Sequence, residues 1–237
     1  MGKKETHTNQ HSSIANSPVK TYLLGYNIVC FLGWCWILIS CIDCIMHDKL
    51  RSLWDAAEIK LKIFQTMAIL EVAHSILGFV RSPWKTTFMQ VLSRLFMVWY
   101  IVNVSGEAQT SIFFVITCTS WALVEVVRYL FYSVNLLGEV PYPLFWLRYS
   151  LFWVLYVTGV IGEIGCMASS LRSVDRYEYE TLEPSPPLLI FRYFFTLFAM
   201  FIFMPGFYIM YTHMIKTSRK QLKEYKQLNR NIKEKQQ

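Results

Sequence analysis

Three polar side chains recur at seven-residue intervals in an otherwise apolar stretch, residues 141–163 (PYPLFWLRYSLFWVLYVTGVIGE). They are Tyr149, Tyr156 and Glu163. Seven residues make nearly two helical turns, so the three face the same way, and Tyr156 and Glu163 lie about 10 Å apart along the axis. Phenol and carboxyl groups are types that transfer protons in enzymes. A carboxylate in an apolar helix usually faces a bundle interior or a water-filled cavity, so we predict a functional site at Tyr156 and Glu163.

Small side chains separate the two members of this pair. Gly159 and Val160 lie between them on the same face, and Gly162 lies to one side. The bare surface leaves room for part of a substrate. It is also typical of helices that pack closely in membranes, and a tyrosine such as Tyr149 can belong to an interfacial belt. Both interpretations of the glycines stay open at this point.

The composition indicates a membrane protein. Of 237 residues, 54% are hydrophobic and 16% are charged, whereas a soluble domain has about 25% charged residues. We predict an all-α membrane protein in which six transmembrane helices form a bundle around an interior substrate cavity. Each apolar segment is long enough to cross about 30 Å of hydrocarbon. The predicted spans are residues 21–45, 57–80, 86–104, 110–137, 144–167 and 188–214.

The positive charge is concentrated at one end of the chain. The net charge is +7, and the segment from Lys216 onward carries eight Lys or Arg and two Glu. A basic segment directly after an apolar helix favours a cytoplasmic flank over nucleic-acid binding, so no nucleic-acid partner is expected. Six spans then place both termini in the cytoplasm. The expected organisation is a polar N-tail (1–20), a membrane domain (21–214) and a basic C-tail (215–237), with a polar loop over 168–187.

The final residues contain a possible address signal. Lys233 and Lys235 form a KxKxx ending, which resembles the dilysine retrieval signal of endoplasmic reticulum membrane proteins. A cytosolic receptor reads this signal, so it requires a cytoplasmic C-terminus. A lysine-rich tail can also produce this spacing by chance.

Five further ionisable residues lie inside the predicted spans: Glu71, His74, Arg94, Glu125 and Arg128. Unpaired charge is penalised in hydrocarbon, so we expect both glutamates to pair with the arginines in a structural polar network rather than in catalysis. His74 shares a helix face with Glu71, and its role is left open. No Cys or His cluster accompanies it at metal-site spacing, so no metal site is expected.

Four motifs together resemble one known family. They are ILEVAHSILG (69–78), SRLFMVW (93–99), WALVEVVRYLFY (121–132) and FWLRYSLFWVLYVTGVIGE (145–163). In this order they are similar to the 3-hydroxyacyl-CoA dehydratases of very-long-chain fatty acid elongation, also called the protein tyrosine phosphatase-like family. The resemblance implies that Tyr156 and Glu163 are the catalytic pair. Val157 stands where family members often have proline.

The resemblance implies dehydration of a (3R)-3-hydroxyacyl-CoA to the trans-2-enoyl-CoA, without a cofactor, in the endoplasmic reticulum membrane. The implied partners are the long-chain acyl-CoA, membrane lipid, the fatty acid elongase, the ketoacyl reductase and the enoyl reductase. Ordinary acidities favour Glu163 as base and Tyr156 as acid, and burial of the carboxyl would allow the reverse. A non-catalytic scaffold of the elongase complex and a small membrane carrier using Glu163 are the alternatives.

Substrate contacts are expected at two places. Gly159 would line the groove between the catalytic pair, and Tyr149 would be a packing or entrance residue. Arg81, Lys85 and Arg148 would meet the phosphates of coenzyme A at the cytosolic face. The alternative for these three cations is that they only follow the positive-inside bias of membrane proteins.

Overall fold

Helices form all of the regular structure in the part of the chain that the computed structural model describes, residues 18–80, 82–180 and 186–235, and no strand occurs there. This confirms the all-α prediction. In chain order the elements are α2 (Pro18–Met46), the 3₁₀ turn η1 (Leu50–Ser52), α3 (Leu53–Met67), α4 (Ile69–Ile76), α5 (Trp84–Leu95), the π-helix η2 (Phe96–Val102), α6 (Gly106–Gln109), α7 (Ile112–Leu137), α8 (Tyr142–Ser150), α9 (Phe152–Glu180) and α10 (Pro186–Lys235).

Four helical segments of the described chain are long and apolar enough to cross a membrane: Pro18–Met46, Ile112–Leu137, Tyr142–Arg172 and Ile190–Lys223. Their lengths run from 26 to 34 residues, and about 20 residues suffice for a hydrocarbon core of about 30 Å. The third segment joins α8 to α9. At this joint Leu151 N–H donates to Leu147 and Leu155 N–H donates to Leu151, so helical hydrogen bonding continues.

The second and third predicted spans differ from single helices. The second begins earlier, at Leu53, and is divided at Ala68 into α3 and α4, which ends at Ile76. The third begins as α5 and changes into the π-helix η2 at Phe96. A π-helix widens the backbone turn, and such segments are frequent at functional sites. Hydropathy alone carries no signal for either change of helix type.

The polar loop predicted over residues 168–187 is wrong in its first part. Helix α9 continues to Glu180, and α10 already begins at Pro186. Residues 168–180 contain neither glycine nor proline, so nothing in them ends a helix when it leaves the apolar region. The basic C-tail is also helical, because α10 continues through it to Lys235. Earlier in α10, the helix passes through Pro205 without interruption.

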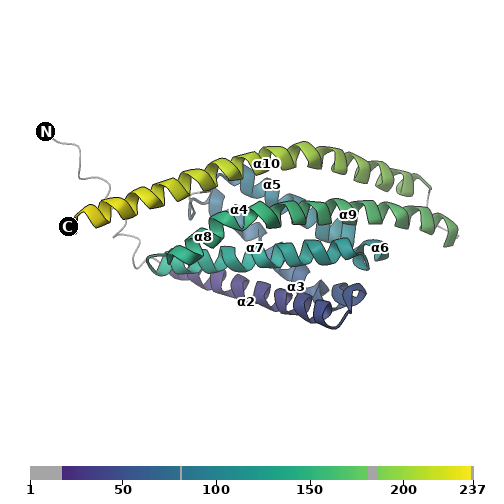
Figure 1. Cartoon of the computed structure of the whole chain (residues 1–237). Coiled ribbons are helices and arrows are strands. Elements are labelled where there is room, and N and C mark those ends of the chain that lie inside the picture. The colour runs from purple at the N-terminus through teal and green to yellow at the C-terminus, as the bar shows by residue number, and fades with distance from the viewer. Residues whose placement is uncertain (1–17, 81, 181–185, 236–237) are drawn as a thin grey trace.

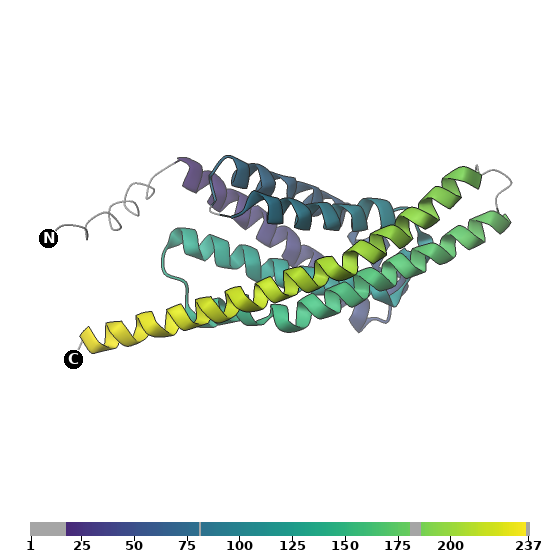
Figure 2. The same ribbon diagram turned by 90° about the horizontal axis from the view of Figure 1, so that it is seen from above.

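Helix α7 lies at the centre of the packing, between α2 and α9 (Figure 1). Helix α3 packs on α2, and α10 packs along α9 (Figure 2). Gly33 permits one of these contacts, because a Cβ atom there would lie 1.9 Å from the Phe64 ring of α3. The largest fully buried apolar side chains come from several helices: Trp34, Tyr129, Phe114, Ile37, Leu53, Leu61 and Met97.

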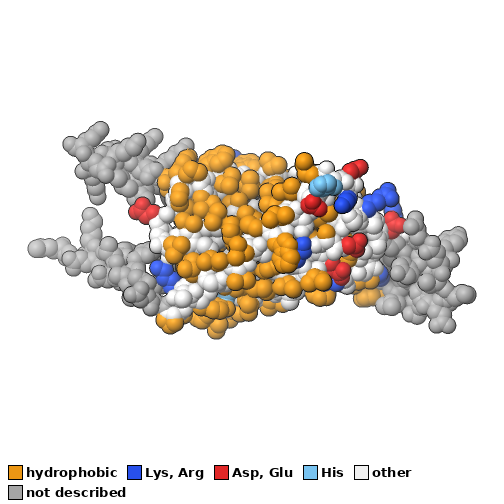
Figure 3. Space-filling model, turned by 90° about the horizontal axis from the view of Figure 1, so that it is seen from below, with side chains coloured by type: hydrophobic (Ala, Val, Ile, Leu, Met, Phe, Trp, Pro, Cys, Tyr) orange, Lys and Arg blue, Asp and Glu red, His pale blue; other side chains and the backbone are white. Residues whose placement is uncertain are grey.

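The outer surface has the distribution of a membrane protein. Figure 3 shows apolar side chains across the middle of one face, with charged side chains mainly toward its two ends. Exposed apolar side chains such as Leu32, Trp36 and Ile39 contribute to the molecular surface. The start of α2 and the end of α10 lie at the same end of the molecule (Figures 1 and 2).

Candidate active site

Glu163 lies in the middle of α9 and is buried, with 8% of its surface exposed. Its carboxylate accepts a hydrogen bond from the indole Nε1 of Trp121 on α7, at 2.8 Å to Oε1. Burying a carboxyl group without a partner costs several kcal/mol, so this indole donor offsets part of that cost. Trp121 was not among the predicted site residues, because in the sequence it cannot be told from the other apolar residues of a spanning helix.

Close packing of α7 against α9 brings Trp121 to Glu163. A Cβ atom on Gly162 would lie 2.3 Å from Thr117 Oγ1 and 2.8 Å from its backbone nitrogen, so only glycine fits. Gly165 is held as closely against the ring of Phe113. Trp121 follows Thr117 by one helical turn and therefore lies on the same side of α7. The small-residue packing interpretation thus applies to Gly162.

Gly159 differs from Gly162. A Cβ atom on Gly159 would meet only the Ser120 Cβ, at 3.8 Å, which is ordinary contact. The neighbouring Thr158 Oγ1 lies 2.9 Å from Ser120 Oγ and joins the same two helices. Helix packing therefore does not require glycine at position 159, and room for a substrate beside it stays a prediction.

Tyr156 lies on α9, about two turns before Glu163, and is half-buried. Its ring stacks on Phe207 of α10, with ring centroids 5.2 Å apart and planes 12° apart, and on Tyr211, at 5.8 Å and 4°. These rings fix the plane of the phenol. Because α9 is continuous from Phe152 onward, the helical spacing of the pair in the sequence holds in the structure.

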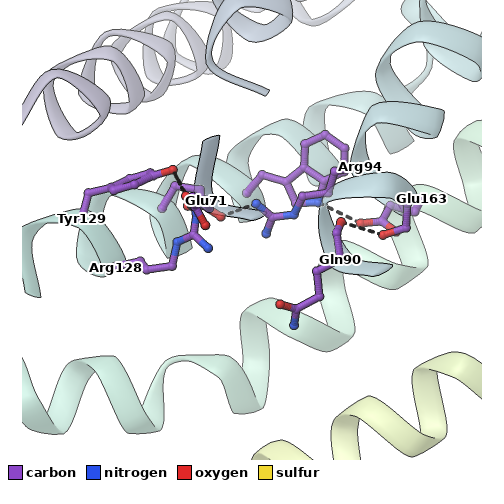
Figure 4. Close-up of polar contacts among 9 residues, drawn as sticks. Glu71, Gln90, Arg94, Arg128, Tyr129 and Glu163 are labelled. Carbon is purple, nitrogen blue, oxygen red and sulfur yellow. Dashed lines mark hydrogen bonds and ion pairs between the residues drawn. The ribbon is translucent and has the colours of Figure 1, made fainter. Parts of the chain in front are cut away.

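The other intramembrane charges form one connected group. Arg94 pairs with Glu125, while Arg128 lies 2.7 Å from Glu71 and 2.7 Å from Glu125. Tyr129, which the sequence analysis did not single out, donates its hydroxyl to Glu71. Figure 4 shows the guanidinium of Arg94 between this group and Glu163. These contacts place each of the four predicted charged residues next to an opposite charge, on α4, α5 and α7.

The same group reaches Glu163 through an aromatic ring. The Arg94 guanidinium lies 5.4 Å from the centroid of the Trp121 ring, a cation–π distance. Trp121 and Glu125 are one turn apart on α7, so Arg94 contacts both of them. The carboxyl of Glu163 therefore accepts from an indole whose ring contacts Arg94, the half-buried partner of the buried Glu125.

His74 lies in a separate aromatic cluster. Its Nε2 is 3.0 Å from the Tyr22 hydroxyl, and its ring packs edge-on against Tyr22 and Tyr26 of α2. The side chain is buried. These contacts account for His74 as a packed residue that joins α4 to α2.

The predicted substrate-binding residues have different surroundings. The Tyr149 ring packs against Phe145, with centroids 4.8 Å apart, and its backbone oxygen accepts from Ser218 of α10 at 2.7 Å. Arg148 lies 5.8 Å from the centre of the Tyr132 ring. Lys85 is exposed beside Trp84. Arg81 lies outside the described residues.

Candidate metal ligands do not gather in the described residues, where no three His, Cys, Asp or Glu side chains are placed to hold one ion. The six cysteines are free thiols, and the nearest approach among them that involves a hydrogen bond is 3.6 Å between Cys41 and Cys118. The chemical groups that the site itself offers are a phenol, a carboxyl group and nearby guanidinium charge.

Comparison with known proteins identifies the family. The model of the protein tyrosine phosphatase-like protein family, PTPLA, matches residues 65–224. The chain belongs to this family. The match includes all four motifs on which the resemblance was based, so that prediction is confirmed. No solved structure matches the chain.

Several curated proteins are similar to this chain over most of its length. The very-long-chain (3R)-3-hydroxyacyl-CoA dehydratase hpo-8 of Caenorhabditis elegans is 41% identical, over 85% of this chain and 94% of that protein. The very-long-chain (3R)-3-hydroxyacyl-CoA dehydratase PASTICCINO 2 of Arabidopsis thaliana is 33% identical, over 87% of this chain and 95% of that protein. The human very-long-chain (3R)-3-hydroxyacyl-CoA dehydratase 2 is 35% identical, over 86% of this chain and 82% of that protein.

Proposed function

We propose that this protein is a hydro-lyase that removes water from a very-long-chain (3R)-3-hydroxyacyl-CoA to give the trans-2-enoyl-CoA. The observation that carries the proposal is the buried Glu163 carboxyl, held from one side by Trp121 and about two turns from Tyr156, in a chain of the PTPLA family. The names of its relatives supply the substrate class. The reaction is a step of fatty acid elongation.

The proposed chemistry assigns one proton transfer to each side chain. Glu163 removes a proton from C2, and the electron pair left on carbon forms the C2–C3 double bond. Tyr156 donates its proton to the hydroxyl on C3, which leaves as water. With ordinary acidities the carboxyl group is ionised at neutral pH and the phenol is protonated, which supports this assignment. The reacting carbons would lie over Gly159, where the helix surface is open.

The proposed setting is the endoplasmic reticulum membrane, with six passes and both termini cytoplasmic. The start of α2 and the end of α10 lie at the same end of the molecule, which supports an even number of passes (Figure 2). The shorter pairs α3–α4 and α5–η2 would complete the count beside the four long segments. Coenzyme A would meet Arg148, Lys85 and Arg81 from the cytosol, and the elongase and the two reductases would act before and after this enzyme.

The proposal is tested by incubating the purified protein in lipid nanodiscs with a long-chain (3R)-3-hydroxyacyl-CoA. We expect an enoyl-CoA product that is lighter by one water. A folded protein that gives no product would contradict the proposal and favour a scaffold. Movement of the acyl-CoA into sealed proteoliposomes without conversion would instead favour a carrier.

A further inference from the structure

The hydrogen bond between Trp121 and Glu163 joins two buried side chains on neighbouring helices. Trp121 is 5% exposed and Glu163 is 8% exposed. The indole Nε1 lies 2.8 Å from Oε1 of the carboxyl group. Within the described residues, no hydrogen bond to the second oxygen, Oε2, is found. The two oxygens of Glu163 are therefore not equivalent.

An indole N–H is a donor and cannot accept a hydrogen bond. Oε1 must then be an acceptor whether Glu163 is ionised or protonated. With the proton on Oε2, Oε1 is the carbonyl oxygen and the better acceptor, so the indole contact favours protonation of Oε2. The contact thus selects one oxygen for proton transfer in either direction.

The orientation of Trp121 is itself fixed. Its ring faces the Arg94 guanidinium at 5.4 Å, and Arg94 pairs with Glu125, one turn further along α7. On the other side, Gly162 holds α9 against Thr117, one turn before Trp121. An indole fixed on both sides can hold a carboxyl group in a single orientation, which is what a proton-transfer site requires.

We propose that Trp121 is a positioning residue that reserves Oε1 of Glu163 and leaves Oε2 as the atom that exchanges the proton with substrate. This inference rests on the proposed dehydratase function. In the forward reaction Oε2 takes the C2 proton, the C2–C3 double bond forms, and the C3 hydroxyl leaves as water with the proton from Tyr156. The proton on Oε2 then returns to the Tyr156 phenolate, directly or through solvent, and both groups regain their starting states.

The test is Trp121→Phe, which keeps an aromatic ring beside Arg94 and removes the N–H donor. Because misplacing a reacting group by about 1 Å costs about 100-fold in rate, we expect kcat to fall by about 10- to 100-fold with KM nearly unchanged. Trp99→Phe is the matched control, since the Trp99 indole donates to Thr66 at 3.2 Å on the exposed surface. It should leave kcat and KM as in the wild type.

A double-mutant cycle separates positioning from general structural damage. If Trp121 acts through the Glu163 carboxyl, adding Trp121→Phe to Glu163→Gln should leave the residual rate nearly unchanged. If the two losses multiply instead, Trp121 acts independently of Glu163 and the inference is overturned. If Trp121→Phe does not fold, 3-benzothienylalanine is placed at position 121, because sulfur replaces the N–H in a ring system of similar size.

The outcomes distinguish this inference from the proposed function. Wild-type protein that converts no substrate contradicts the proposed function. Active wild type, an inactive Glu163→Gln variant and a folded Trp121→Phe variant with unchanged kcat would overturn the role of Trp121 alone. Loss of kcat in Trp121→Phe, together with no further loss in the double variant, supports it.

Discussion

Arg128 stabilises two carboxylates at once, because its guanidinium lies 2.7 Å from both the half-buried Glu71 and the buried Glu125. Removing one partner of a buried ion pair leaves an uncompensated charge, which costs about 3–5 kcal/mol. We therefore expect Arg128→Met to lower the free energy of unfolding by about that amount, measured by thermal unfolding in detergent. Arg219→Met removes an exposed arginine and should leave the melting temperature unchanged. Equal melting temperatures for the two variants would contradict the role of this network.

The direction of proton transfer gives a second prediction at the level of single residues. If Glu163 is the base, it should catalyse exchange of C2 hydrogen with solvent deuterium in a saturated acyl-CoA, which has no hydroxyl group to lose. We expect Tyr156→Phe to retain this exchange and Glu163→Gln to lose it, as measured by mass spectrometry of the acyl-CoA. The opposite pattern would reverse the two assignments.

The sequence could identify Tyr156 and Glu163 because their relation depends only on helical spacing within α9. It could also predict that Glu71, Arg94, Glu125 and Arg128 need opposite charges, since burial of charge is costly wherever the helices meet. The role of Trp121 depends on how closely α7 approaches α9, which is a tertiary property. In the sequence, Trp121 is recognisable only as a tryptophan one turn before Glu125. That spacing does not indicate that its indole contacts Glu163 on another helix.

At the scale of elements, the α7–α9 contact depends on Gly162 and not on Gly159. Gly162→Ala places a methyl group within 2.8 Å of the Thr117 backbone, so the helices must separate. We expect lower thermal stability and loss of activity in this variant. Gly159→Ala is the matched control and should unfold like the wild type, since its Cβ has ordinary contacts. Destabilisation of both variants to the same extent would contradict this difference.

A larger side chain at position 159 tests the open space beside the catalytic pair. We expect Gly159→Leu to fold and to lose most of its dehydratase activity, because the added atoms occupy the surface between Tyr156 and Glu163. Stability is followed by thermal unfolding, and activity by enoyl-CoA formation. Full activity in a folded Gly159→Leu variant would show that substrate does not occupy this surface.

The ends of elements were predicted less well than their centres. Apolar content marks where a helix can lie in lipid, and the four long segments agree with the predictions made from it. It does not mark where a helix stops in water, so the continuation of α9 to Glu180 and of α10 to Lys235 was missed. The division at Ala68 and the π-helix from Phe96 depend on packing that no periodic pattern records.

At the scale of the whole molecule, the path of the chain predicts a topology. The end of α9 and the start of α10 lie at the opposite end of the molecule from the start of α2 and the end of α10 (Figure 2). We expect glycosylation acceptor tags at either terminus to remain unmodified in microsomes, and an acceptor inserted between α9 and α10 to be glycosylated. Modification of a terminal tag would contradict the cytoplasmic placement of both ends.

The paired action of Tyr156 and Glu163 is tested most directly by the rates of two conservative variants of the purified protein. Tyr156→Phe and Glu163→Gln each remove one proton-transfer group while nearly preserving size. We expect each to lower kcat for dehydration of a long-chain (3R)-3-hydroxyacyl-CoA by at least about 100-fold, with unfolding temperatures close to the wild type. Wild-type rates in both folded variants would show that the reaction takes place elsewhere in the molecule.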